Sequence, residues 1–166
     1  MPGGRVLMLA HHFPPAGGSG ANRALAMASF LSEYGWQPTV VTPGVAWAAN
    51  RDDGLLAELQ RGVRVVRTRS FEALPAPATA SGARARPRSR ASRAGGALRV
   101  ARSQVGHLKR LPDAHVGWVP FALAAARRER FEVAYSSSGP FSSHLVGLLL
   151  KLATNKPWVA ELRDGW

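Results

Sequence analysis

The hydrophobic positions along the chain fall into short apolar runs, separated by segments in which apolar residues recur with a helical period. Five runs are short, apolar and bounded by turn residues, a pattern that predicts buried β-strands. The predicted strands are residues 5–10, 38–42, 63–68, 132–136 and 157–162. The first two are apolar almost throughout, which is typical of parallel strands covered on both faces.

Between these runs the spacing predicts amphipathic helices. The predicted helices are residues 21–34, 54–61, 120–130 and 141–153. Gly35 and Asn155 stand where a left-handed residue commonly ends a helix. Pro120 suits the first position of a helix, where its missing N–H has no intrahelical partner.

The alternation of strands and helices predicts an α/β fold with a doubly wound parallel sheet, Rossmann-like, in a single domain spanning 1–166. In such sheets ligands bind beyond the carboxyl ends of the strands, where the strand order reverses. The loops expected at that edge are residues 11–20, 43–53, 136–140 and 163–166.

The composition changes in the middle of the chain. Residues 73–96 consist almost entirely of Ala, Pro, Ser, Gly and Arg, which predicts a low-complexity insert that is weakly ordered over 76–92. Residues 97–110 regain apolar spacing and predict a basic amphipathic helix.

Positive charge is concentrated in the same region. The net charge is +12, and nine Lys and Arg residues with no acid lie between Arg84 and Arg110. Three interpretations are open: attachment to an anionic membrane surface, nucleic-acid binding, and a solvated linker. The segment lacks the interleaved aromatic residues of a single-strand binder, so we expect residues 84–110 to contact an anionic membrane and no nucleic acid.

Cysteine is absent, which excludes a disulfide framework and a cysteine-based zinc site. The first apolar run is too short for a signal-peptide core, and no run approaches the roughly 18 residues of a membrane span. We therefore expect a cytoplasmic protein, peripheral at the inner face of the cell membrane.

The loop after the first strand reads HHFPPAGGSG and leads into a helix. Gly18-Ser19-Gly20 begins a dinucleotide-type fingerprint, but Arg23 replaces the third glycine and no acid ends the second strand. A Walker A sequence is also absent. A glycine-rich turn at a helix N-terminus still favours a phosphate or carboxylate, and Arg23 would add a cation. The alternative is that the glycines only make a tight turn.

His11 and His12 directly follow the first strand. A metal site needs a third ligand, and the positions of His107, His115 and His144 do not predict convergence with this pair. We therefore expect no metal, with one histidine lining the cleft and the other packing in the loop.

Two further polar segments follow predicted strands. Ser136 to Gly139 either binds a sugar or phosphate or caps the next helix. Glu161 to Trp166 places Arg163 and Asp164 at a strand end, where a carboxylate either binds sugar hydroxyls or forms a salt bridge that fixes a loop.

Three blocks occur in a distinctive order. The first is RVLMLAHHFPPAGGSGANRALAMASFLSEYGWQPTVVTP, the second LPDAHVGWVPFALAAARR, and the third VAYSSSGPFSSHLVGLLLKLATNKPWVAELRDGW. They cover nearly the whole chain except about 70–105. Together they resemble the amino-terminal, acceptor-side domain of family 4 glycosyltransferases, which have the GT-B fold.

The resemblance implies retaining transfer of a sugar from a nucleotide-sugar donor to a cell-envelope glycan or lipid-linked acceptor, with no bound metal or cofactor. The loop facing the donor phosphates would comprise Gly17, Gly18, Ser19, Gly20 and Arg23. The acceptor-side residues would be His12, Ser137 and Ser138. The catalytic candidates would be His144, Arg163 and Asp164.

The sequence departs from the family at its end. Gly165 stands where the family often has proline or leucine, and the family's donor signature, two glutamates separated by seven residues, does not occur up to Trp166. We therefore expect an amino-terminal half of the GT-B fold that is incomplete at its C-terminus and inactive alone. It would be a fragment, a truncated gene product or one half of a two-chain enzyme, with a separate donor-domain chain as a candidate partner. The alternative function is a non-catalytic Rossmann-like module that binds an anionic metabolite.

Overall fold

The computed structural model describes residues 3–44, 50–59, 62–71 and 112–163. Within them, five parallel strands form one sheet in the order β3-β2-β1-β4-β5. The strands are β1 (Arg5–Leu9), β2 (Gln37–Pro43), β3 (Arg64–Thr68), β4 (Val133–Ser137) and β5 (Trp158–Glu161). The chain begins in the middle of the sheet, builds outward to β3, and then returns to the other side of β1. This is the doubly wound order expected from the sequence, and its switch point lies between β1 and β4.

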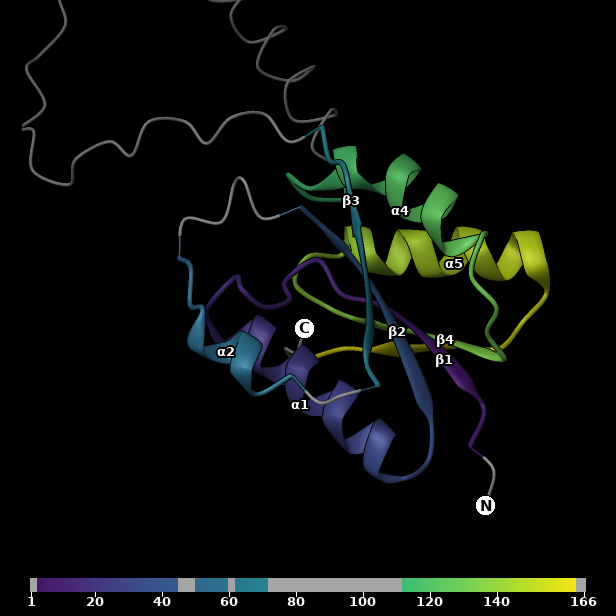
Figure 1. Cartoon of the computed structure of the whole chain (residues 1–166). Helices are drawn as coiled ribbons and strands as arrows, with labels where there is room; N and C mark the ends of the chain where they lie inside the picture. The colour runs from purple at the N-terminus through teal and green to yellow at the C-terminus, as the bar shows by residue number, and fades with distance from the viewer. Residues whose placement is uncertain (1–2, 45–49, 60–61, 72–111, 164–166) are drawn as a thin grey trace, which may run out of the picture.

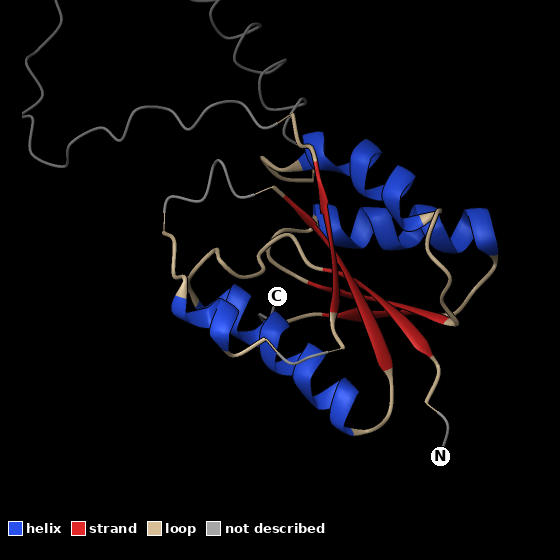
Figure 2. Cartoon of the chain, in the orientation of Figure 1, coloured by secondary structure: helices blue, strands red, loops and turns tan. Residues whose placement is uncertain are grey.

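Helices cover both faces of the sheet. They are α1 (Ser19–Glu33), α2 (Gly54–Ala57), the 3₁₀ turn η2 (Val116–Trp118), α4 (Val119–Ala126) and α5 (Ser142–Thr154). α1 and α2 lie on one face, and α4 and α5 lie side by side on the other (Figure 1). The result is a three-layer α/β arrangement (Figure 2).

Strand β1 shows why the central strands are apolar throughout. Successive side chains point to opposite faces, so Leu7 and Leu9 pack against the α4–α5 layer while Val6 and Met8 pack against α1. All four are at most 3% exposed. Burying each such side chain contributes about 1.5–3 kcal/mol, which makes β1 the centre of both cores.

The predicted helix ends are confirmed at Gly35 and Asn155, whose φ angles are 79° and 53°. α4 ends at Ala126, four residues before the predicted end. The N–H groups of Arg128 and Glu129 donate to carbonyls three residues earlier, at Ala125 and Ala126. These shorter-range hydrogen bonds form a tight turn that ends the α-helix.

The insert at 73–96 and the basic helix expected at 97–110 lie outside the described residues, as does the whole of the basic window 84–110. Across the described ranges, no helix combines the length and apolar character needed to cross a bilayer.

Candidate functional site

The carboxyl ends of β1 and β4 lie side by side at the switch point, because Leu9 is in register with Ser136. The loop after β1 and the β4–α5 turn therefore leave the sheet together. The first carries His12 and leads into α1; the second carries Ser138 and Gly139. The sequence predicted both loops at this edge.

Arg163 is fixed to the β4–α5 turn. Its Nε–H donates to the Ser138 carbonyl at 2.6 Å, and Nη2 donates to the Gly139 carbonyl at 3.2 Å. Its backbone N–H donates to Ser138 Oγ at 2.8 Å. Gly139 has a φ of 72°, and a Cβ there would collide with the guanidinium. The turn thus holds a rigid cationic fork.

The free end of this guanidinium reaches the start of α1. A Cβ built on Gly20 would lie 3.6 Å from Arg163 Nη1 and 3.5 Å from His12 Cβ. No side chain caps α1, and its first turn contains no acidic residue. The partial positive charge of the helix N-terminus is therefore reinforced by Arg163, an arrangement that favours an anion.

The glycine-rich loop is braced by the chain that follows β2. The Gly17 N–H donates to the Asn50 carbonyl at 2.8 Å, and the Asp52 N–H donates to the Pro15 carbonyl at 2.8 Å. The Gly17 amide is thus already used within the protein. The residues of the loop whose backbone amides are candidates to contact an anion are therefore Gly18, Ser19 and Gly20.

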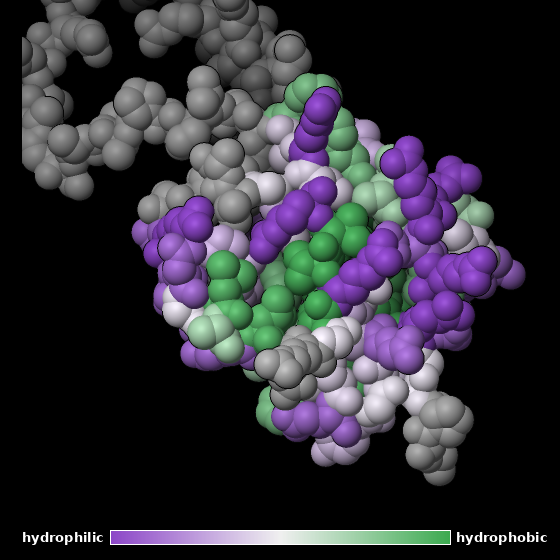
Figure 3. Space-filling model, viewed as in Figure 1, coloured by the Kyte–Doolittle hydropathy of each residue, from purple (hydrophilic) through white to green (hydrophobic). Residues whose placement is uncertain are grey.

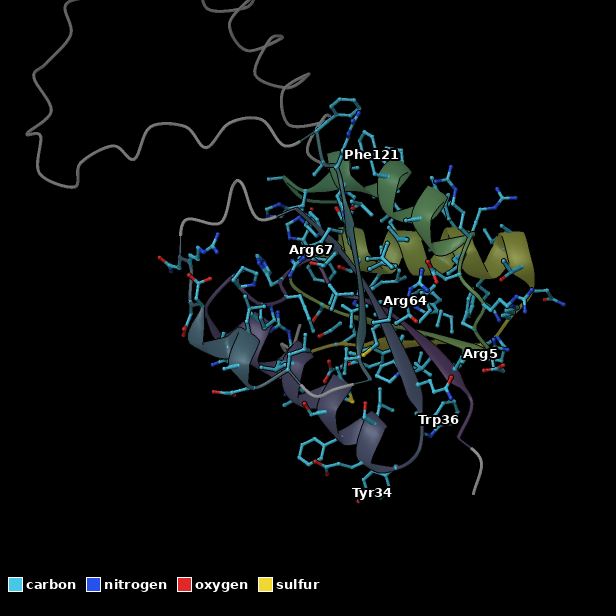
Figure 4. All side chains as sticks on the ribbon, viewed as in Figure 1. Arg5, Tyr34, Trp36, Arg64, Arg67 and Phe121 are labelled. Carbon is cyan, nitrogen blue, oxygen red and sulfur yellow. The ribbon has the colours of Figure 1, made fainter. Side chains whose placement is uncertain are left out.

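Arg67, which is labelled in Figure 4, braces the same loop from β3. Its guanidinium donates to the Pro14 carbonyl. Burial lowers the pKa of Arg67 below its usual value. Sequence reasoning missed this contact, because an arginine in a predicted strand carries no local signal of where its side chain ends.

Arg23 forms an ion pair with Glu161. Tyr135 and Ser137 hydrogen-bond to the same carboxylate. The bond from Arg23 is the main cause that lowers the pKa of Glu161 to about 2. Burial, followed by the bond to Glu161, raises the pKa of Tyr135 above its usual range. Glu161 is therefore ionised at neutral pH and ties α1 to β5.

His144 is joined to the end of β4 by two partly buried hydrogen bonds that share Ser136 Oγ. Trp158 Nε1–H donates to Ser136 Oγ at 2.8 Å, and Ser136 Oγ lies 2.7 Å from His144 Nδ1. Burial lowers the pKa of His144, against a smaller opposing effect of Glu161. Its Nε2 is buried and meets no hydrogen-bonding group of the described chain.

The serines after β4 do not cap α5. Asp113 does so from a distant segment: Oδ2 accepts the Ser142 N–H at 2.7 Å, and Oδ1 accepts the Ser142 hydroxyl at 2.6 Å. Of the two interpretations of Ser136 to Gly139, simple capping is thus wrong. Nothing local in the sequence marks Asp113 as a cap, since its helix begins 29 residues later.

A histidine cluster lies behind the site. The ring centroid of His115 is 4.2 Å from that of His11 and 6.1 Å from that of His12, and His11 stacks edge-on against Trp118. The position of His115 in the sequence did not predict this convergence with His11 and His12. Even so, no three His, Asp or Glu side chains of the described ranges are arranged to hold a metal ion.

The structure thus brings together His12, Gly18, Ser19, Gly20 and Arg163, with Ser138 positioning the last. Ser137 and Arg23 instead contact Glu161, and His144 belongs to the adjacent Ser136 chain. Asp164 lies outside the described residues, so its catalytic role stays a prediction.

No protein-family model matches the chain, and no curated protein sequence matches it significantly.

Proposed function

We propose that this domain binds the diphosphate of a nucleotide sugar at the switch point and serves as the acceptor-side domain of a glycosyltransferase. The observation that carries the proposal is the meeting of Arg163 Nη1 with the uncapped N-terminus of α1 beside Gly20. Both groups favour negative charge. The resemblance to family 4 glycosyltransferases supplies the identity of the anion.

The chemistry of sugar transfer fits this pairing. Breaking the bond between the anomeric carbon and the diphosphate oxygen leaves charge on the diphosphate. Hydrogen-bond donors of the protein that are already fixed in position before the reaction stabilise such charge without having to reorganise. Arg163 meets this requirement because Ser138 and Gly139 fix its guanidinium, while Nη1 makes no hydrogen bond to the described residues.

The acceptor would lie against His144 and His12. The His144 Nε2 is buried and meets no hydrogen-bonding group of the described residues, so a sugar hydroxyl that enters beside it would be a suitable partner. Nucleobase recognition belongs to a second domain in this proposal, and residues 84–110 hold the protein at an anionic membrane on the cytoplasmic side.

Binding is tested by titrating the protein with UDP, GDP, ADP and inorganic pyrophosphate while recording backbone amide shifts by NMR. We expect the largest shifts at Gly18, Ser19 and Gly20. Arg163→Gln should weaken binding by about tenfold, as expected for loss of a charge-assisted contact. Arg127→Gln removes an exposed charge far from the site and serves as the control.

A transfer assay with labelled nucleotide sugars separates the two functions. Transfer that requires a second, donor-binding protein and is lost in Arg163→Gln supports the glycosyltransferase. Saturable pyrophosphate binding with no transfer in any combination supports the anion-binding module instead. Amide shifts that avoid the α1 N-terminus would contradict both.

A further inference from the structure

A cavity of about 600 Å³ lies at the opposite edge of the sheet from the candidate site. Its walls come from the amino ends of β1, β2 and β3 and from the segment that follows α4. Four arginines line it: Arg5, Arg64, Arg128 and Arg130. Three separate parts of the chain thus direct guanidinium groups to one hollow, because the amino ends of parallel strands share an edge.

The cavity holds more positive than negative charge. Glu129 is the single carboxylate in its lining, and it pairs with Arg64 at 3.1 Å. Arg5 pairs with Glu132 just outside, at 3.3 Å. Arg128 and Arg130 are exposed and form no ion pair within the described residues. Arg5 and Arg64 therefore each have one carboxylate partner, while the charges of Arg128 and Arg130 are not balanced by any carboxylate of the described residues.

The electrostatics of α4 explain only part of this cluster. Cations near a helix C-terminus are favourable, which accounts for basic residues after Ala126. The same effect does not account for Arg5 and Arg64, which lie at the amino ends of β1 and β3 (Figure 4). Figure 3 shows hydrophilic side chains around an apolar patch on this face of the molecule.

We propose that this cavity is a second anion site, which binds a ligand carrying two or more phosphate groups. Guanidinium forks match phosphate oxygens, and four of them suit a ligand with several negative charges. The volume lies within the usual range of small-molecule sites. Thr39 and Gln37 supply neutral polar groups on the same wall. The site is separate from the proposed donor site and does not depend on it.

The test uses the full chain and calorimetric titration with tripolyphosphate at fixed ionic strength. The double variant Arg128→Gln/Arg130→Gln should weaken binding by about tenfold or more, because it removes the two unpaired guanidiniums. The matched control is Arg69→Gln/Arg127→Gln, which removes the same charge from exposed arginines outside the cavity. Glu129→Gln should strengthen binding, since it removes the one lining carboxylate.

Several phosphate groups can be presented by a soluble ligand or by a lipid headgroup, so a parallel experiment uses phosphatidylcholine vesicles with and without phosphatidylinositol 4,5-bisphosphate. Selective loss of tripolyphosphate binding in the cavity variant supports a soluble ligand; selective loss of binding to the vesicles with phosphatidylinositol 4,5-bisphosphate supports a lipid headgroup. Equal losses in the cavity and control variants, or no binding in either experiment, overturn the proposal.

Discussion

Asp113 caps helix α5 through Ser142, across 29 residues of sequence: one carboxylate oxygen accepts the Ser142 N–H at 2.7 Å and the other accepts its hydroxyl at 2.6 Å. Oδ1 also accepts the His115 N–H at 2.8 Å. A single carboxylate thus joins the segment before α4 to the start of α5, directly beside the β4–α5 turn that holds Arg163.

Asp113→Ala should lower the free energy of unfolding by about 1–3 kcal/mol, because it removes a cap and leaves the buried Ser142 hydroxyl unpaired. Urea denaturation measures this loss. Asp53→Ala is the control: Asp53 is exposed, pairs with Arg51, and caps no helix through its side chain. Similar losses in the two variants would show that Asp113 contributes no more than a surface carboxylate.

Gly147→Ala should destabilise the protein although alanine is the better helix former. A Cβ at this position would overlap the Trp158 indole, which packs against α5 in the buried core. Overpacking of this kind costs about 1–3 kcal/mol, more than the gain of about 1 kcal/mol in helix propensity.

Gly20→Ala provides the contrast, because a Cβ there meets its neighbours at ordinary contact distances of 3.5 Å or more. Thermal and urea unfolding should give Gly147→Ala a lower stability than the unsubstituted protein, and Gly20→Ala an equal or higher stability. An unchanged Gly147→Ala protein would mean that the indole moves aside at no cost.

Glu161 should make stability depend on acid pH. Its pKa of about 2 lies below the usual value of 4.5, so its stabilising effect is complete above pH 4.5 and is lost as the pH falls toward 2. We expect a loss of about 1 kcal/mol, since Arg23 is half exposed and solvent screens the pair. Glu161→Gln should flatten this part of the curve, measured by urea unfolding at several pH values.

Glu58→Gln is the matched control, because Glu58 is an exposed carboxylate outside any ion pair of the described residues. If both glutamine variants retain the same acid dependence as the original protein, the stabilisation comes from other carboxylates.

The fold was predictable from the sequence because its signals are local. Leu7 and Leu9 lie in an apolar run, the spacing from Ala21 onward repeats with a helical period, and Gly35 marks a helix end. Each signal needs only neighbouring residues. The parallel order then follows from the alternation of strands and helices.

The candidate site was predictable as an edge of the sheet but not as a set of contacts. Arg163 could be placed at a strand end, yet its bonds to Ser138 and Gly139 depend on how the β4–α5 turn meets β5. Arg23 was expected to face a ligand, and only the packing of α1 beside β5 brings it to Glu161. The convergence of His115 with His11 likewise depends on the position of η2.

His144 should be neutral at pH 7 and carry its proton on Nε2. Ser136 Oγ accepts the Trp158 N–H, and among the described residues His144 Nδ1 is the acceptor available to the Ser136 hydroxyl proton. Burial keeps the pKa of His144 below its usual 6.5. Imidazole nitrogen shifts measured by NMR over a pH series report both the tautomer and the pKa.

Ser136→Ala should produce a mixture of the two tautomers, because Nδ1 loses its donor. Ser143→Ala is the matched control: this serine is also fully buried, and its hydroxyl has no hydrogen-bond partner in the described structure. A protonated Nδ1 in the original protein would mean that Ser136 accepts from both neighbours. His144 would then present a lone pair at Nε2, and an acceptor hydroxyl would donate to it rather than accept from it.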